Sequence, residues 1–193
     1  MATPVADRLH VRLLGGLDVR LDGEPVGGLD SARARSVLAY LVLHDLAHDG
    51  SPLARQRLAF VLWPDSSEGQ ARTNLRHVLH TLRSASPTLG RHLDVTPQTL
   101  RWRTGTGSWV DVRAFEAALD RADRPDAPAA EVVDALREAI GLYAGDLLEG
   151  AYDDWIVEDR ERLRDRYVEA LRRPRPPTGG LPPAADAAPR RGR

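Results

Sequence analysis

Residues 70–83 read QARTNLRHVLHTLR, and this stretch decides the fold of the first half of the chain. At 100° per residue its apolar side chains fall on a single stripe of a helix. The stripe consists of Ala71, Leu75, Val78, Leu79 and Leu82. The opposite face carries Arg72, Thr73, Arg76, His77, His80 and Arg83, with no acidic residue in the stretch. The pattern therefore predicts an amphipathic helix with a basic outer face.

Two interpretations of that basic face are open. Guanidinium groups can bond phosphates or guanine edges, and a threonine can reach a base or its methyl group, so the face suits the major groove of DNA. A solvated basic face on an ordinary surface helix gives the same pattern. The segments on either side of the stretch have to decide between them.

The residues before the stretch predict a small sheet and two helices. Leu9–Gly15 and Leu17–Leu21 are rich in Leu and Val, with His10, Arg12, Asp18 and Arg20 alternating between apolar positions, which predicts two short strands. A third strand over Glu24–Val26 follows the Asp22–Gly23 turn. Ser31 caps a helix over 32–44, and Ser51–Pro52 begins a second one that ends at Trp63–Pro64. The first turns of these helices carry Arg33, Arg35, Arg55 and Arg57, which either meet phosphates or are simply solvated.

A loop and a hairpin flank the basic helix. Asp65–Gly69 is the loop, and Ser67 with Gln70 forms a capping-box signature at the start of the helix, which Pro87 closes. Beyond it, apolar and polar residues alternate on both sides of Pro97–Gln98, which predicts a hairpin with Arg101 and Arg103 on its outer face. Strands, three helices and a hairpin, in this order, are typical of an α+β winged helix-turn-helix. In this context the interpretation of 70–83 as a recognition helix is favoured.

The second half of the chain has a different character. Residues 104–108, TGTGS, form a joint, and amphipathic helices are expected over Asp111–Ala122, Ala129–Tyr143 and Tyr152–Arg172. Consecutive helices with short connections indicate stacked helical hairpins of solenoid type. Residues 174–193 are rich in Pro, Gly, Ala and Arg and are expected to be disordered. The predicted domains are thus 1–106 and 107–173, followed by a tail.

The distribution of charge supports this division. Residues 1–110 hold 13 arginines and 10 acidic residues, whereas residues 111–173 hold 10 arginines and 17 acidic residues. Between residues 70 and 103, six arginines face Asp94 as the one acidic residue. A basic segment followed by an acidic one indicates two domains with different partners.

Several function classes are excluded or disfavoured. The chain has no cysteine, no apolar run of roughly 20 residues and no secretory signal pattern, so a cytoplasmic protein without a membrane segment is expected. No phosphate-binding loop or catalytic motif is present, so we expect neither an enzyme nor a cofactor. His44 and His48 are better explained by a helix end than by a metal site. The acidic run Asp153–Asp154 and Glu158–Asp159 is expected to be a solvated face rather than a contact for a partner's arginines.

Several motifs together resemble those of the SARP-type antibiotic regulatory proteins. In the first half these are RLLGGLDVRLDG, RARSVLAYLVLH, LARQRLAFVLWPDSSEGQARTNLRHVLHTLR and LDVTPQTLRW. In the second half, residues 111–122 and LYAGDLLEGAYDDWIVEDRERLRDRYVEAL resemble the start of a bacterial transcriptional activator domain. The resemblance covers about residues 8–172 and implies an OmpR/PhoB-like winged helix followed by a shortened activator domain with TPR-like helices.

The resemblance implies a transcriptional activator that binds direct repeats in double-stranded DNA and recruits RNA polymerase. It places the recognition helix at 70–83, Arg101 and Arg103 in the wing, and a polymerase-contact loop at Asp65, Ser66, Ser67 and Glu68. It also allows a homodimer on DNA. Two alternatives stay open: a protein-interaction module whose acidic helical half docks a partner, and a truncated regulator that binds DNA without activating transcription.

Overall fold

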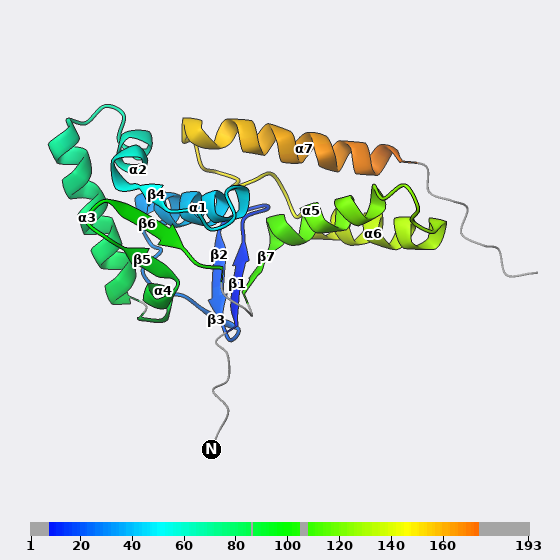
Figure 1. Ribbon diagram of the computed structural model, residues 1–193, viewed down its shortest axis with the longest axis horizontal. Helices are drawn as coiled ribbons and strands as arrows, with labels where there is room; N and C mark the ends of the chain where they lie inside the picture. Colours follow the sequence, from blue (N-terminus) through cyan, green and yellow to red (C-terminus); the bar gives the residue numbers. More distant parts are fainter. Residues whose placement is uncertain (1–7, 86, 105–107, 174–193) are drawn as a thin grey trace, which may run out of the picture.

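The computed structural model describes residues 8–85, 87–104 and 108–173, and these form a lobe joined to a helical arm (Figure 1). The lobe contains two small sheets and helices α1 to α4, and the arm contains α5, α6 and α7. The predicted TGTGS joint falls largely on 105–107, and the predicted tail on 174–193, so both lie outside the described residues. None of the described helices is long and apolar enough to cross a membrane.

The predicted N-terminal strands form, although the first ends at Arg12 rather than at Gly15. Strands β1 (Leu9–Arg12), β2 (Asp18–Leu21) and β3 (Glu24–Pro25) pair antiparallel in succession. The turn between β2 and β3 places Asp22 at φ 50° and Gly23 at φ 91°. These are the left-handed values that a two-residue hairpin turn requires, and Asp-Gly supplies them at low cost. The sheet therefore begins with a hairpin that its own turn residues fix.

Helix α1 (Ala32–Ala47) crosses the lobe and contributes a large share of its core. Ser31 caps it as predicted, because its hydroxyl accepts a hydrogen bond from the Ala34 N–H at 3.0 Å. The helix runs three residues beyond the expected end at His44. Its inner side is fully buried, as the sequence indicates, at Val37, Leu38, Leu41 and Val42.

The prediction that Ser51–Pro52 begins the second helix is wrong. Leu53–Ala54 form strand β4, and helix α2 covers Arg55–Leu62. Leu53 is 2% exposed and pairs with Leu100 across the sheet. The backbone hydrogen bonds of that pairing and the burial of Leu53 stabilise the strand more than the local Ser51–Pro52 capping pattern stabilises a helix.

Helix α3 (Glu68–Ala85) begins two residues earlier than expected, so Glu68 and Gly69 are helical and the loop is shorter than predicted. Ser67 accepts a hydrogen bond from the Gln70 N–H at 3.4 Å, but the Gln70 side chain bonds Asn74 instead of returning to Ser67. The capping box is therefore half formed. The helix ends before Pro87 as expected, and Pro87 then begins a short unpredicted helix, α4 (Pro87–Arg91).

The predicted hairpin is confirmed. Strands β5 (Leu93–Val95) and β6 (Thr99–Trp102) pair antiparallel, and β6 lies between β5 and β4 in a three-stranded sheet. Leu100 and Trp102 are buried, while Arg101 and Arg103 are exposed, which matches the expected alternation.

The helices of the arm agree with the sequence except at one start. Helices α5 (Asp111–Ala122) and α6 (Ala129–Leu142) form an antiparallel pair within one residue of the expected bounds. The third predicted helix does not begin at Tyr152, because a 3₁₀ turn over Asp154–Ile156 precedes α7 (Val157–Arg172) and Tyr152 is 94% exposed. Asp153 has an extended backbone there, and its carboxylate binds residues of α1.

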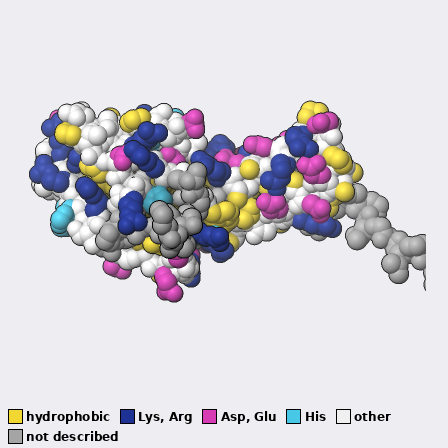
Figure 2. Space-filling model, turned by 60° about the horizontal axis from the view of Figure 1, so that its bottom comes forward, with side chains coloured by type: hydrophobic (Ala, Val, Ile, Leu, Met, Phe, Trp, Pro, Cys, Tyr) yellow, Lys and Arg dark blue, Asp and Glu magenta, His cyan; other side chains and the backbone are white. Residues whose placement is uncertain are grey.

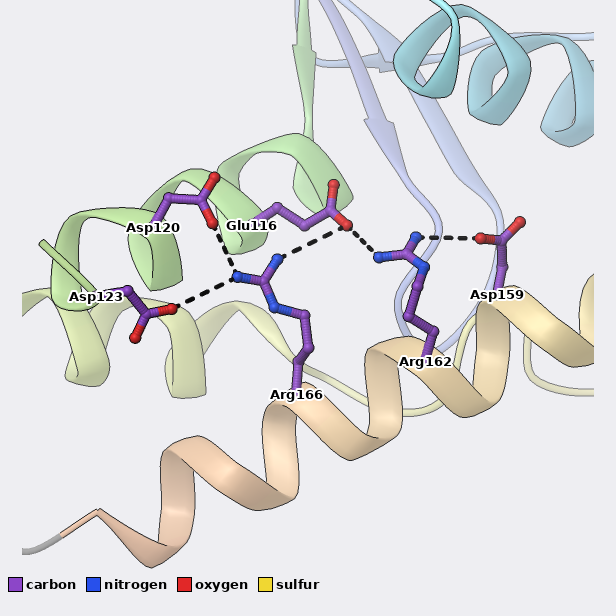
Figure 3. A network of polar contacts seen from close by, with 6 residues as sticks. All are labelled: Glu116, Asp120, Asp123, Asp159, Arg162 and Arg166. Carbon is purple, nitrogen blue, oxygen red and sulfur yellow. Dashed lines mark hydrogen bonds and ion pairs between the residues drawn. The ribbon is translucent and has the colours of Figure 1, made fainter.

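Arginines of α7 hold the helix against α5 (Figure 3). Arg162 pairs with Glu116 at 2.5 Å and with Asp159 of its own helix at 3.1 Å. Arg166 lies among Glu116, Asp120 and Asp123, with its shortest contact to Asp120 at 2.8 Å. Asp159, which the sequence indicated as part of a solvated acidic face, therefore pairs with an arginine of its own chain.

The arm is joined to the lobe through backbone as well as side chains. Strand β7 (Trp109–Val110) pairs in parallel with β1, which gives the sheet order β3-β2-β1-β7. The segment after α6 returns to the same place: Leu147 forms a bridge with Leu14, and the Leu148 N–H donates to the Leu13 carbonyl at 2.7 Å. Both ends of the α5–α6 hairpin are thus fixed beside β1.

Candidate nucleic-acid interface

Helix α3 presents the face that the sequence predicted. Its apolar stripe is buried against α1 and α2, whereas each of the six predicted DNA-binding residues of the helix is exposed. These six are Arg72, Thr73, Arg76, His77, His80 and Arg83. The burial of five apolar side chains on the other side fixes the orientation of the helix. The polar face is therefore held rigidly toward solvent.

The arginines of this face differ in what they contact. Arg72 forms an ion pair with Glu68, one turn earlier, and Glu68 also accepts a hydrogen bond from Gln56 at 3.0 Å. Arg76 and Arg83 have no ion pair with any residue that the structure describes. The charge of Arg72 is therefore partly neutralised, while Arg76 and Arg83 are available to an external anion.

The hydroxyl of Thr73 is partly committed within the helix. It donates to the Gly69 carbonyl at 2.9 Å, which leaves its lone pairs free to accept a hydrogen bond. His77 and His80 are exposed on the same face. The centre of the face thus combines a hydroxyl, imidazole rings that can donate or accept, and guanidinium donors, a set that can bond both base edges and phosphates.

The two hairpin arginines lie on the outer side of β6, but in different surroundings. Arg103 pairs with Asp94 of β5 at 2.5 Å. Arg101 lies over the turn that follows α1: Gly50, at φ +70°, is so close that a Cβ there would approach an Arg101 nitrogen to 3.3 Å. Arg103 therefore needs to leave a carboxylate before it can meet an anion, whereas Arg101 keeps its charge unpaired among the described residues.

The structure brings α3 together with the tip of the hairpin rather than with these two arginines. Arg72 and Arg76 line a groove of about 630 Å³ whose other walls include Arg55, Pro97 and Gln98. The sequence pattern puts Arg55 in a first helical turn, where either solvation or phosphate binding is open, and it gives no signal for Gln98. No pattern in the sequence could place the hairpin tip beside α3, because that proximity depends on tertiary packing.

A second hollow lies on the other side of Arg72, beside the predicted polymerase-contact loop. It has a volume of about 610 Å³ and is lined mainly by apolar side chains of α2 and the following loop, together with Ser66 and Glu68. Phe60 lines it and is 71% exposed, which is unusual for a phenylalanine. Sequence reasoning missed Phe60, since it falls on the helical pattern of α2 and gave no separate signal.

Charge is distributed unevenly over the surface. Figure 2 shows arginine predominating over the lobe, while basic and acidic side chains alternate along the arm. The alternation on the arm reflects ion pairs such as those between α7 and α5. The exposed arginines of α3 thus belong to a lobe whose visible surface is richer in basic side chains than the arm.

A buried carboxylate stands where the arm begins. Asp111 accepts hydrogen bonds from the backbone N–H groups of Leu13, Leu14 and Val112 at 2.8–2.9 Å. Burial raises the pKa of this carboxyl, and the three backbone donors oppose that effect. Asp111 thus joins the end of β1 to the first turn of α5. Sequence reasoning counted it only as the start of a helix.

A second carboxylate links the arm to α1. Asp153 accepts from Arg33 at 2.6 Å and from the Ser36 hydroxyl at 2.9 Å. Next to it, Trp155 packs edge-on against Tyr40 of α1 with ring centroids 5.0 Å apart. The acidic run predicted as a solvated face therefore meets an arginine, but one of the same chain.

Comparisons with known proteins agree with this arrangement. Residues 110–174 match the bacterial transcriptional activator domain. No curated protein matches the chain. Among solved structures, the fold is similar to that of Mycobacterium tuberculosis EmbR in complex with a low-affinity phosphopeptide, with a TM-score of 0.66 and 24% sequence identity. The similarity covers 86% of this chain and 44% of the EmbR chain, so this chain spans less than half of EmbR.

The shared fold extends over both the lobe and the arm, and the family match lies on the arm, from the last residue of β7 to the end of α7. The chain therefore carries a match to the bacterial transcriptional activator domain, the domain expected for its second half, and it shares its fold with EmbR.

Proposed function

We propose that this protein is a DNA-binding transcriptional activator in which α3 is the recognition helix of a winged helix-turn-helix. The lobe is then the DNA-binding domain, predicted as 1–106, and the arm is the activator domain, predicted as 107–173, with TPR-like helices. The hairpin β5–β6 is the wing. Double-stranded DNA and RNA polymerase are the partners, and two copies bind adjacent repeats.

One observation carries this proposal. After Glu68, the 18-residue helix α3 exposes arginine, histidine and threonine and contains no further acidic side chain, while its other side is anchored in the core. A rigid helix with such a face has the diameter and the donors to enter the major groove. The similarity of fold to EmbR and the match to the activator domain support the same function.

The contacts of each side chain suggest different roles on DNA. Arg76, Thr73 and His80, at the centre of the face, are proposed to meet base edges. Arg72 and Arg83 are proposed to meet the backbone, with His77 at the rim. Arg101 and Arg103 in the wing are proposed to bind phosphates. A bidentate contact from Arg76 to guanine is worth on the order of 1–3 kcal/mol of discrimination.

Gel-shift and footprinting with Arg76→Ala test the recognition helix. The variant is expected to bind its site more weakly and to discriminate less between sites at the base that Arg76 meets. Arg113→Ala is a matched control, since Arg113 is an exposed arginine on α5 of the arm. Unchanged affinity and unchanged site preference in Arg76→Ala would refute the assignment of α3.

The wing makes a different prediction in the same assay. Arg101→Ala is expected to weaken binding to all sequences alike and to flatten the salt dependence, because a phosphate contact carries no sequence information. A change in site preference without a change in salt dependence would contradict the proposed role of Arg101.

Activation is proposed to use the loop at Asp65, Ser66, Ser67 and Glu68. The apolar hollow beside it and the exposed Phe60 support a protein contact there. Transcription in vitro with Phe60→Ser and Asp65→Ala separates activation from DNA binding. DNA binding should be unchanged while transcription falls. Full transcription by both variants would exclude this surface as the polymerase contact.

A second candidate function is a protein-interaction module without activation. The outer side of α7 favours it, because Val157 and Leu171 are 46% and 49% exposed. Loss of a partner on replacing both with serine, together with no shift on promoter fragments at low salt, would support this function over the first. A DNA shift by the unmodified protein would exclude it as the main activity.

A further inference from the structure

The groove between α3 and the hairpin tip is lined by three arginines. Arg55 comes from the first residue of α2, and Arg72 and Arg76 come from successive turns of α3. Leu75, Ala54 and Pro97 form apolar parts of its walls, and Gln98 adds an amide. At about 630 Å³ the groove is wide enough for a phosphodiester group with its neighbouring sugars.

No acidic side chain is among the described residues that line this groove. Glu68, the partner of Arg72, lines the neighbouring hollow beside Phe60 instead. The positive charge of Arg76 and burial both lower the pKa of Arg55, with burial the larger cause. The free protein therefore holds two like charges near each other without a carboxylate between them, an arrangement that costs free energy until an anion enters.

Arg55 is held in place by the hairpin tip. Its backbone N–H donates to the Gln98 carbonyl at 2.9 Å, and its guanidinium donates to the Thr96 carbonyl at 3.0 Å. The guanidinium has further N–H groups and is half-buried. One edge of the side chain is thus used to fix its position, which leaves the remaining donors pre-organised at the groove.

Two of the other three arginines in first helical turns are already bound within the protein, and the third lies outside the groove. Arg33 binds Asp153, and Arg35 donates to the carbonyls of Leu29 and Asp30. Arg57 lines the hollow beside Phe60 rather than the groove. Of the four arginines that the sequence placed at helix starts, Arg55 alone combines a fixed position with a neighbouring unpaired arginine.

We propose that Arg55 binds one backbone phosphate of the DNA in this groove, beside the base-reading Arg76, and that this contact locks the hairpin tip against the recognition helix. The proposal rests on the proposed DNA-binding function and adds a residue that the function did not include. A phosphodiester carries one negative charge and two free oxygens, so it can accept from the Arg55 guanidinium and offset the repulsion between Arg55 and Arg76. Arg55 is then a positioning residue that fixes the register of α3 on the duplex.

The first experiment measures DNA affinity against salt concentration for Arg55→Gln. Glutamine retains an N–H donor for the Thr96 carbonyl but removes the charge. Loss of one phosphate contact should flatten the slope of log K against log[salt] by about 0.9 and weaken binding about tenfold. Site preference should stay the same. Arg57→Gln, on the same helix but outside the groove, is the control and should match the unmodified protein.

Arg55→Lys separates charge from structure. Lysine restores the positive charge without the fork of donors, so the salt slope should return to that of the unmodified protein while affinity stays lower. Thermal melting of each variant without DNA shows whether the hairpin has loosened. A flattened slope in both Arg55→Gln and Arg55→Lys, accompanied by a lower melting temperature in both, would mean a structural role only and would overturn the proposal.

A second experiment needs no DNA and uses sodium sulfate as the probe. Sulfate at the same ionic strength as sodium chloride should raise the melting temperature of the unmodified protein and of Arg57→Gln by more than that of Arg55→Gln or Arg76→Gln. At low ionic strength without sulfate, Arg76→Gln should melt no lower than the unmodified protein, because the substitution removes the repulsion with Arg55.

The outcomes separate this proposal from the function on which it rests. If the unmodified protein shifts DNA and Arg55→Gln keeps the affinity and slope of Arg57→Gln, the phosphate site is wrong and the function stands. If no DNA is shifted, the function fails, and a sulfate effect lost in Arg55→Gln would assign the groove to a free anion instead. A flattened slope without a sulfate effect supports a site that only the phosphate of a bound duplex can fill.

Discussion

Replacing Asp111 tests how strongly the arm depends on a single buried carboxylate. Asp111 is 2% exposed and accepts from the N–H groups of Leu13, Leu14 and Val112. In Asp111→Ala these three donors lose their partner inside the protein. At about 1–2 kcal/mol for each unsatisfied N–H, the loss is about 3–6 kcal/mol, and removal of a buried charge returns part of it. We expect a net decrease of about 2–4 kcal/mol in the free energy of unfolding.

Urea unfolding followed by circular dichroism and tryptophan fluorescence measures this decrease. Trp109 lies in β7, two residues before Asp111, so fluorescence also reports on the joint itself. Asp120→Ala is the control, because Asp120 lies on the same helix with an exposed side chain and an ion pair to Arg166. Its removal should cost less than about 1 kcal/mol. If the two variants differ by less than 1 kcal/mol, the carboxylate does not hold the joint and the reasoning fails.

Three further predictions concern the contacts of the arm. A double-mutant cycle of Arg33→Ala and Asp153→Ala should give a coupling of about 0.5–1 kcal/mol in urea unfolding, and additive effects would show that the pair is not formed in solution. Burial and its hydrogen bond to Asp146 raise the pKa of Tyr143 to about 12, so its contribution to stability is complete below pH 10 and is lost as the pH rises through about 12. Absorbance at 295 nm should therefore show a late phase that Tyr143→Phe removes, and persistence of that phase would assign it elsewhere. The Arg164 guanidinium lowers the pKa of Asp146, so this contribution is present above the ordinary pKa and disappears as the pH falls through the lowered one. Stability should then depend less on pH in the acid range in Arg164→Gln, and an unchanged acid profile would contradict the pairing.

Periodicity was sufficient to predict the elements with strong local patterns. The stripe of α3, the inner side of α1 and the alternation in β5 and β6 all depend on residues within one element, and the structure confirms each of them. The cap at Ser31 and the Asp22–Gly23 turn are also local, since their hydrogen bonds and dihedral angles involve neighbours in the sequence.

The errors occurred where distant residues decide the structure. Ser51–Pro52 is a good helix start in isolation, but Leu53 pairs with Leu100, almost fifty residues further along the chain. The helix predicted from Tyr152 begins late because Asp153 binds Arg33 and Ser36 of α1. In both cases a tertiary contact outweighs a local preference, and no pattern within one segment could reveal it.

The same distinction applies to the candidate interface. The exposed face of α3 could be predicted in full, because amphipathicity alone determines which side chains point outward. The ion pair that restrains Arg103, the groove with Arg55 and the exposure of Phe60 could not, since each depends on elements whose relative position only the fold gives. The contacts of these residues with DNA and polymerase stay predictions.

The parallel pairing of β7 with β1 and the return of the chain at Leu147 have a mechanical consequence. The α5–α6 hairpin leaves the sheet at β7 and returns to it at Leu147, so both of its ends are attached beside β1. A hairpin attached at both ends has less freedom to rotate than a domain joined by a single linker. A partner that binds the far end of the hairpin can bend it but cannot rotate it away from the lobe. Binding of a partner to the arm would then affect α1 and α3 through small displacements at Asp111 and Asp153, with little change in the orientation of the arm relative to the lobe.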